Sequence, residues 1–264
     1  MKFNKIYSYV LIMFLVVTLF GCTTKEKNDV NLESKVNITV SAAASLCGAM
    51  DVIKELYEAE NSQISVTLNY GSSGSLQRQI EQGADVDIYF SAAKNKMETL
   101  KEENLIYDST EINLLTNSLV VIVPKDMLNI TSIDEMKSSE VQSIGMGEPD
   151  SVPAGKYAEE SLMNLNIIEA IKDKIIYAKN VKEVLAWVET GNVEVGMVYR
   201  SDALSSDKVD LVIEIPEESH NSIVYPAAII KSSSKIVQAK AFLKYLQGDE
   251  AKQVFEEYGF NTIS

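Results

Sequence analysis

The sequence predicts an α/β protein with a mainly parallel sheet. Short runs rich in β-branched residues alternate with longer amphipathic segments, an order typical of β-α-β units. After residue 35 the sequence has no internal repeat, no low-complexity block and no Pro/Gly-rich linker. Two domains, if the chain has them, must therefore be joined by strands that cross from one to the other.

The β-branched runs and the apolar spacing predict the individual elements. Strands are expected at residues 36–40, 64–69, 86–90, 119–123, 143–146, 195–199, 211–215 and 224–230. Helices are expected at 46–60, 75–82, 94–101, 154–164 and 181–190, with two more between 235 and 258. In the first helix, Met50, Ile53, Leu56 and Tyr57 recur at spacings of three and four residues, which places them on one face. Gly83 and Gly191 follow two of the helices and fit left-handed caps.

The first 22 residues resemble a bacterial lipoprotein signal peptide. Lys2 and Lys5 precede an apolar run at 9–20 that stops at Gly21 and Cys22. The run is about a dozen residues long, whereas a membrane-spanning helix needs roughly 20. We expect cleavage before Cys22, lipid on that cysteine, and a location on the outer face of the cell membrane. An ordinary signal peptide cleaved nearby is the alternative.

Residues 23–35 are polar and charged without an apolar period. Such a composition cannot bury enough surface to offset its ordering entropy. We expect this segment to be a flexible tether between the membrane and the folded body.

The charge balance argues against nucleic acid as a partner. The full chain has 24 basic and 38 acidic residues, a net charge of -14. Without Lys2 and Lys5, 22 basic residues face 38 acidic ones and the net charge is -16. Binding to phosphate backbones needs a basic surface. A small anionic ligand remains compatible with this charge where local dipoles form the site.

Catalytic and metal-binding signals are weak. His220 is the only histidine and lies in a polar stretch, and Ser73 is not in the Gly-x-Ser-x-Gly context of a nucleophile elbow. A Ser73/His220 pair lacks a clear orienting acid, although a serine hydrolase stays an alternative. No His/Cys cluster has ligand spacing. If Cys22 carries lipid, Cys47 is the remaining thiol and no intrachain disulfide forms.

Small, hydroxyl-bearing or Gly/Pro residues stand where expected strands pass into helices. These junctions are 41–46 (SAAASL), 70–75 (YGSSGS), 151–155 (SVPAG) and 180–181 (NV). Each alone is a good helix cap or helix start. Gathered in one crevice outside the carboxyl ends of the strands, their free N–H groups and dipoles would form an anion cage without Lys or Arg. The Ser/Gly turn lacks the Gly-Lys-Ser/Thr of a P-loop, so nucleotide binding is not expected.

In seven segments the chain resembles the periplasmic molybdate-binding proteins of molybdate ABC transporters, here in a lipoprotein form. The segments are 41–46, 70–92, 117–124, 147–158, 196–203, 225–230 and 258–260. The resemblance implies a type II periplasmic-binding-protein fold, with two α/β domains joined by two crossing strands and the ligand in the cleft. It implies crossings at 119–123 and 225–230, a first domain of residues 36–118 plus 226–264, and a second domain of 119–225.

The resemblance also implies a ligand set and partners. Matching positions carry over as donors to a molybdate or tungstate oxyanion: the Ser45 and Ser73 hydroxyls, the Ala154 and Val181 backbone N–H groups, and the Tyr199 phenol. No cofactor is implied, and molybdenum enters only as the oxyanion. The chain is expected to be a monomer that serves an ABC permease and a cytoplasmic ATPase. Sulfate or another tetrahedral oxyanion is the alternative ligand, and a surface adhesin is a further alternative function.

Overall fold

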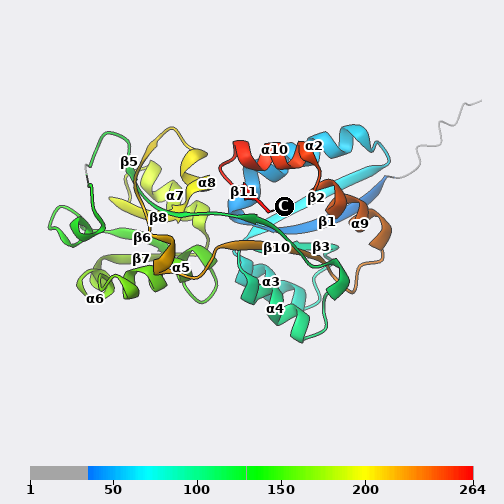
Figure 1. Ribbon diagram of the computed structural model, residues 1–264, viewed down its shortest axis with the longest axis horizontal. Helices are drawn as coiled ribbons and strands as arrows, with labels where there is room; N and C mark the ends of the chain where they lie inside the picture. Colours follow the sequence, from blue (N-terminus) through cyan, green and yellow to red (C-terminus); the bar gives the residue numbers. More distant parts are fainter. Residues whose placement is uncertain (1–34, 129, 264) are drawn as a thin grey trace, which may run out of the picture. The chain divides into compact units, whose positions relative to one another are not determined.

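The computed structural model describes residues 35–128 and 130–263 (Figure 1). Residues 35–264 form one compact unit. The signal peptide, Cys22 and residues 23–34 of the tether lie outside the described residues, so those expectations stay predictions. No helix in the described part of the chain is long and apolar enough to cross a membrane.

Strands and helices alternate through most of the chain. The strands are β1 (Val36–Ala43), β2 (Ile64–Gly71), β3 (Ile88–Phe90), β4 (Ile112–Thr116), β5 (Leu119–Pro124), β6 (Ile144–Gly147), β7 (Ile175–Ala178), β8 (Val195–Tyr199), β9 (Val209–Glu214), β10 (Val224–Ile229) and β11 (Asn261–Thr262). The α-helices are α2 (Cys47–Glu60), α3 (Ser73–Glu81), α4 (Lys94–Glu102), α5 (Pro153–Asn164), α6 (Ile168–Ile171), α7 (Val181–Glu189), α8 (Arg200–Leu204), α9 (Ile236–Tyr245) and α10 (Asp249–Glu257). Single 3-10 turns include η1 (Ala44–Leu46), which leads from β1 into α2.

The described strands form two sheets. The first has the order β11-β4-β10-β3-β1-β2 and the second the order β7-β6-β8-β5-β9. Strands β2, β1 and β3 are parallel, as are β7, β6 and β8. The other pairings are antiparallel. The sheets are therefore mixed rather than mainly parallel, which corrects the expectation, because β5 and β10 run against their parallel neighbours.

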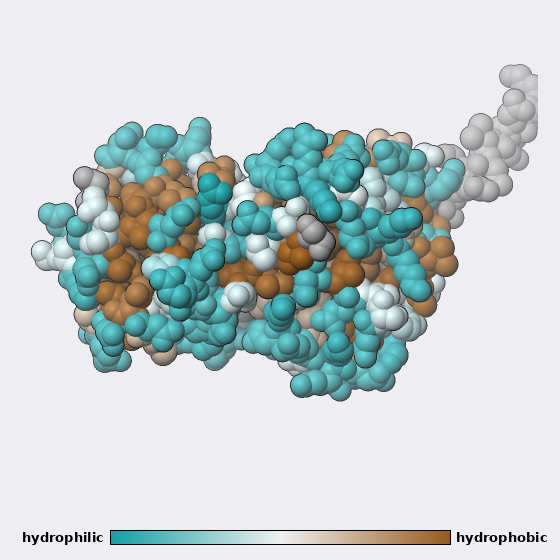
Figure 2. All heavy atoms as spheres, viewed as in Figure 1, coloured by the Kyte–Doolittle hydropathy of each residue, from teal (hydrophilic) through white to brown (hydrophobic). Residues whose placement is uncertain are grey.

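Each expected strand and helix overlaps an element of the structure, but several elements were not expected. The missed strands are β4, β7 and β11, and the missed helices include α6 and α8. In α2, Met50, Ile53 and Tyr57 are buried, as their spacing predicts, and Leu56 is partly buried against the same core. On the face shown in Figure 2, hydrophilic residues (teal) border patches of apolar ones (brown).

The chain passes twice between the two sheets. Asn117 and Ser118 separate β4 in the first sheet from β5 in the second, and residues 215–223 lead from β9 to β10. The Asn117 N–H donates to the Ile223 carbonyl at 3.3 Å, so the two connections run side by side (Figure 1). Strands β5 and β10, which were expected to cross, each continue from one of these connections.

A buried carboxylate ties the first sheet to the segment before α9. Asp87, at 0% exposure, accepts hydrogen bonds from the Thr39 N–H at 2.7 Å and from the Ser233 hydroxyl at 2.6 Å. The Lys235 ammonium lies 3.1 Å from the same carboxylate. These donors come from β1 and from the segment before α9, two distant parts of the chain, so Asp87 holds them together.

We expect Asp87→Ala to lower the free energy of unfolding by about 1 to 3 kcal/mol, because it leaves the Thr39 N–H and the buried Ser233 hydroxyl without their acceptor. Urea unfolding followed by circular dichroism measures the change. Asp85→Ala, at an exposed position two residues away, serves as the control and should change stability by less than about 0.5 kcal/mol. A loss as small as the control's would contradict a structural role for Asp87.

Candidate functional site: a donor-lined cavity between the two sheets

A small cavity lies where chain segments from both sheets meet. Every residue expected to bind a ligand lines it, namely Ser45, Ser73, Ala154, Val181 and Tyr199. The other lining residues carry no charged side chain. The space open to the centre of a water molecule is about 10 Å³, close to the least that holds one water. In this arrangement the cavity is too small for a sugar or an amino acid.

The first sheet contributes two turns to the cavity. Strands β1 and β2 are paired in parallel up to their last residues, Ala43 and Gly71. Ser45 lies in η1 directly after β1, and α3 begins at Ser73 shortly after β2. The Ser72 hydroxyl caps α3 by accepting an N–H of its first turn at 3.3 Å. The aligned strand ends bring Ser45 and Ser73 to the same edge of the sheet.

The second sheet contributes three groups in a similar way. Strands β6 and β7 are also paired in parallel up to their last residues. Helix α5 begins at Pro153, directly before Ala154, and α7 begins at Val181 with Asn180 as its side-chain cap. Tyr199 is the last residue of β8, the other neighbour of β6. The carboxyl ends of three parallel strands thus face the turns of the first sheet.

Helix starts supply the positive end of the site. Ser73, Ala154 and Val181 stand at the first or second position of their helices. N–H groups at these positions have no acceptor within their own helix. Each helix start also carries roughly half a positive charge. With no charged side chain in the lining, the cavity is complementary to an anion.

The Ser73 hydroxyl is held as a donor. Ser73 is 0% exposed, and its Oγ accepts the Ala92 N–H at 2.9 Å. Its carbonyl accepts the Tyr89 hydroxyl at 2.8 Å, which fixes the first turn of α3. Because the oxygen already accepts a bond, the hydroxyl proton is free to be donated into the cavity.

Tyr199 presents an unsatisfied hydroxyl. The side chain is 1% exposed, and its Oη has no hydrogen-bond partner among the described residues. Burial, the largest cause, raises the pKa of Tyr199 well above its usual value, so the phenol keeps its proton. An unsatisfied buried polar group costs about 1 to 3 kcal/mol. A ligand oxygen in the cavity would accept this hydrogen bond and remove the cost.

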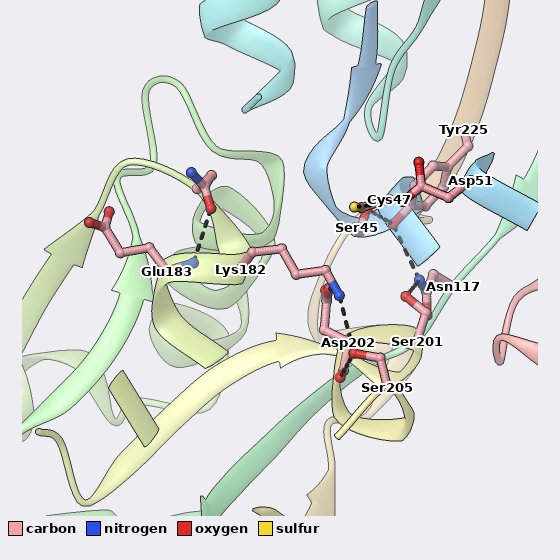
Figure 3. A network of polar contacts seen from close by, with 11 residues as sticks. Ser45, Cys47, Asp51, Asn117, Lys182, Glu183, Ser201, Asp202, Ser205 and Tyr225 are labelled. Carbon is pink, nitrogen blue, oxygen red and sulfur yellow. Dashed lines mark hydrogen bonds and ion pairs between the residues drawn. The ribbon is translucent and has the colours of Figure 1, made fainter. Parts of the chain in front are cut away.

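A partly buried ion pair of Lys182 and Asp202 lies close along the chain to the cavity residues Val181 and Tyr199, and Figure 3 shows its two side chains in contact. Lys182 follows Val181 in α7, and its Nζ lies 3.1 Å from Oδ1 of Asp202 in α8. Asp202 is 0% exposed, and burial raises the pKa of its carboxyl while Lys182 opposes the rise. Neither carboxylate oxygen has a well-formed hydrogen bond within the described residues. Lys182 is therefore the main group that offsets a negative charge near the cavity.

Two hydrogen bonds close the cavity edge between α3, α4 and the loop before α5. The Gly74 N–H donates to the Ser151 carbonyl at 2.9 Å, and the Lys96 ammonium donates to the Asp150 carbonyl at 3.0 Å. A Cβ on Gly74 would lie 2.8 Å from the Ser151 oxygen, so glycine permits this close approach. A larger groove of about 570 Å³ runs beside this edge and includes Pro153. Its lining carries both lysines and acidic residues, so it lacks the uniform donor character of the cavity.

Residues 38–261 match the family described as "Bacterial extracellular solute-binding protein". The chain belongs to this family. It is 44% identical over 262 residues, 99% of both chains, to "Putative ABC transporter substrate-binding lipoprotein YvgL" of Bacillus subtilis (strain 168). It is 36% identical to "Molybdate-binding protein ModA" of Haemophilus influenzae, over 87% of this chain and 91% of that one.

A solved structure agrees with this assignment. The "substrate binding domain of putative molybdenum ABC transporter from Clostridium difficile" is 43% identical, with a TM-score of 0.69 over 87% of this chain and all of that one. The two-domain periplasmic-binding fold expected from the sequence is confirmed. Members of the family are solute-binding proteins and not enzymes.

For this solute-binding protein, the hydrolase alternative has no support in the contacts of Ser73 or His220. The Ser73 hydroxyl bonds Ala92, whereas His220 Nδ1 contacts the Asn221 carbonyl at 2.8 Å and the ring does not line the cavity. Within the described residues, no group of three or more His, Cys, Asp or Glu side chains could hold a metal ion.

Sequence reasoning missed the groups that surround the predicted site residues. It assigned no role to Lys182, Asp202, Tyr225 or Asn117. Tyr225 and Asn117 lie in segments that carry the family resemblance, which was the available signal. Their contacts with the cavity residues depend on how distant parts of the chain meet.

Proposed function

We propose that the chain is the extracytoplasmic substrate-binding subunit of an ABC importer and that it captures molybdate, and also tungstate. The observation that carries this proposal is the donor-lined cavity with the unsatisfied Tyr199 hydroxyl. The 36% identity to a protein named for molybdate binding supports the choice of oxyanion. The Ser45, Ser73 and Tyr199 hydroxyls and the Ala154 and Val181 N–H groups would bind the oxyanion, with molybdenum present only at its centre.

The donor character of the cavity favours an anion without a proton. Hydrogen bonds to a charged acceptor are the strong class, and donors fixed by helix geometry lose little entropy on binding. Molybdate, tungstate and sulfate are fully deprotonated at neutral pH. Monohydrogen phosphate brings a proton that needs an acceptor, and no carboxylate lines the cavity. An unpaired polar group costs about 1 to 3 kcal/mol, so phosphate should bind weakly.

The proposal includes two domains that close around the anion. Their bounds are 36–118 plus 226–264 for the first domain and 119–225 for the second. The change of sheet between β4 and β5 supports the break after Ser118. Ser45 and Ser73 then belong to one domain and the other three ligand groups to the second, so the anion bridges them.

The proposal also includes location and partners. Lipid on Cys22 would hold the protein at the outer face of the cell membrane, and the name of the Bacillus subtilis relative as a lipoprotein supports this. A membrane permease and a cytoplasmic ATPase would complete the importer. The subunit would act as a monomer, because both halves of the cavity come from one chain.

Isothermal titration calorimetry with molybdate, tungstate, sulfate and phosphate tests the proposal. We expect molybdate and tungstate to bind most tightly and to raise the melting temperature by mass action. Tighter binding of sulfate than of molybdate would make the protein a receptor for another oxyanion. Absence of binding and of any thermal shift would favour an adhesin, and ester turnover abolished by Ser73→Ala would indicate a hydrolase.

Ser73→Ala is expected to weaken molybdate binding by roughly 1 to 3 kcal/mol, which is about 5-fold to 150-fold in Kd. The mutation removes a donor that the Ala92 N–H holds in place. Calorimetry on the purified variant measures the change. Ser75→Ala is the matched control, because Ser75 lies in the same turn and does not line the cavity. Equal affinities of Ser73→Ala and the control would mean that the turn is only structural.

A further inference from the structure

The orientation of the Asn117 side chain is determined by its own neighbour. Its Oδ1 accepts the Ser118 N–H at 2.9 Å, so the amide nitrogen must face the other way. That nitrogen donates to the Ser201 hydroxyl at 2.8 Å and to the Tyr225 hydroxyl at 3.2 Å. Both amide protons are therefore used, and Tyr225 is an acceptor from Asn117.

Among the described residues, the Ser45 hydroxyl is the one acceptor in hydrogen-bond geometry for the proton of Tyr225. Tyr225 is 0% exposed, and its Oη lies 3.0 Å from Ser45 Oγ. If Ser45 donated to Tyr225, the phenol proton would be buried without an acceptor, at a cost of about 1 to 3 kcal/mol. The proton of Tyr225 therefore goes to Ser45. The proton of Ser45 is left for the cavity that Ser45 lines.

We propose that Asn117 and Tyr225 are positioning residues that hold the Ser45 hydroxyl as a hydrogen-bond donor to the bound oxyanion. This inference rests on the proposed function. Figure 3 labels Asn117, Tyr225 and Ser45, which are linked by hydrogen bonds at 3.2 Å and 3.0 Å. In the proposed relay, Asn117 donates to Tyr225, Tyr225 donates to Ser45, and Ser45 donates to the anion. No charged group takes part, so the relay adds donor capacity without adding charge.

The relay also links the ligand to the connections between the sheets. Asn117 lies in the first connection, and Tyr225 lies in β10 just after the second. Ser201 belongs to α8 beside the second sheet, whereas Ser45 follows β1 of the first. The relay is complete only when these four segments are in the arrangement described here. Orientation of the Ser45 proton thus depends on the arrangement of the two domains.

A double-mutant cycle tests the relay. Molybdate affinity is measured by calorimetry for the unmodified protein, Ser45→Ala, Tyr225→Phe and the double variant. We expect each single variant to bind on the order of tenfold more weakly. The double variant should bind no more weakly than Ser45→Ala, because Tyr225 acts through Ser45. Tyr57→Phe, at a tyrosine of α2 outside the cavity lining, controls for loss of a tyrosine hydroxyl and should leave affinity unchanged.

Asn117→Ala provides a second variant should Tyr225→Phe fail to fold. It removes the donor to Tyr225, and its effect on affinity should also vanish in the Ser45→Ala background. If Tyr225→Phe or Asn117→Ala weakened molybdate binding equally with and without the Ser45 hydroxyl, the relay would be overturned. The loss of affinity would then come from changed packing and not from the Ser45 proton. Unchanged affinity in both Tyr225→Phe and Asn117→Ala would overturn it as well, while leaving the proposed function intact. An unmodified protein that binds no oxyanion would overturn the proposed function and the relay together.

Discussion

Tyr199→Phe is expected to weaken molybdate binding and, in the same protein, to stabilise the ligand-free state. In the ligand-free state the Tyr199 hydroxyl is buried without a partner in the described part of the chain. Removing it relieves an unsatisfied polar group, for an expected gain of about 1 kcal/mol in the free energy of unfolding. In the complex the same hydroxyl donates to a charged oxygen. Losing that bond should cost about 1.5 to 3 kcal/mol, or more than tenfold in Kd.

Chemical unfolding without ligand and calorimetry with molybdate measure the two effects separately. Tyr89→Phe is the matched control, because the Tyr89 hydroxyl is buried and donates to the Ser73 carbonyl at 2.8 Å. Removing the Tyr89 hydroxyl should lower the free energy of unfolding, whereas Tyr199→Phe should raise it. Lower stability in Tyr199→Phe would mean that its hydroxyl has a protein partner and is not reserved for a ligand.

Lys182→Met is expected to lower both stability and anion affinity at neutral pH. Lys182 is the ammonium at 3.1 Å from the buried Asp202 carboxylate. Breaking a buried ion pair by removing one partner costs about 3 to 5 kcal/mol. The carboxylate left behind lies near a cavity proposed to hold a dianion, so repulsion should also weaken molybdate binding, on the order of tenfold.

The losses of folding stability and of molybdate affinity in Lys182→Met should both become smaller as the pH falls. Burial raises the pKa of Asp202 in the folded protein, and losing Lys182 raises it further. A raised carboxyl pKa means that the folded protein binds the proton more tightly than the unfolded chain, whose value is about 3.9. The loss of folding stability is therefore absent below the unfolded pKa of about 3.9. It grows as the pH rises through the folded pKa of Asp202 and is largest above that folded pKa.

Urea unfolding and calorimetry at several pH values between about 5 and 8 follow this dependence. Lys179→Met is the control, because Lys179 is 79% exposed and its pair with Glu183 spans 3.7 Å. Exposed pairs contribute at most about 1 kcal/mol, so the control should change little. Asp202→Asn added to Lys182→Met should recover most of the stability. Losses of equal size at every pH would indicate that Lys182 acts through packing.

Much of the site could be anticipated because its chemistry is local. Ser72 and Asn180 cap their helices, and Pro153 starts one, as their residue types predict. Parallel strands end at the same edge of a sheet, so the turns that follow them meet there. The choice of Ser45 and Tyr199 as ligand groups came from the family resemblance, and both line the cavity.

The strands that were not expected from the sequence are short and depend on partners far along the chain. Strand β7 has four residues, of which Ile176 and Tyr177 are exposed, and it forms an edge of the second sheet. Strand β11 has only two residues and pairs with β4, which the sequence analysis also missed. Such strands exist because a partner far along the chain supplies their hydrogen bonds. Pairing of this kind leaves little periodicity in the segment itself.

By itself, the sequence determined the alternation of strands and helices, the caps at the helix starts, and the family. Tertiary structure alone decided that the sheets are mixed and that Tyr199 is left without a partner among the described residues. It also decided that the hydroxyls of Ser45 and Tyr225, 180 residues apart, lie within hydrogen-bond distance. Helix caps depend on neighbours within one turn, whereas proton direction in a buried cavity depends on every donor and acceptor that folding brings there.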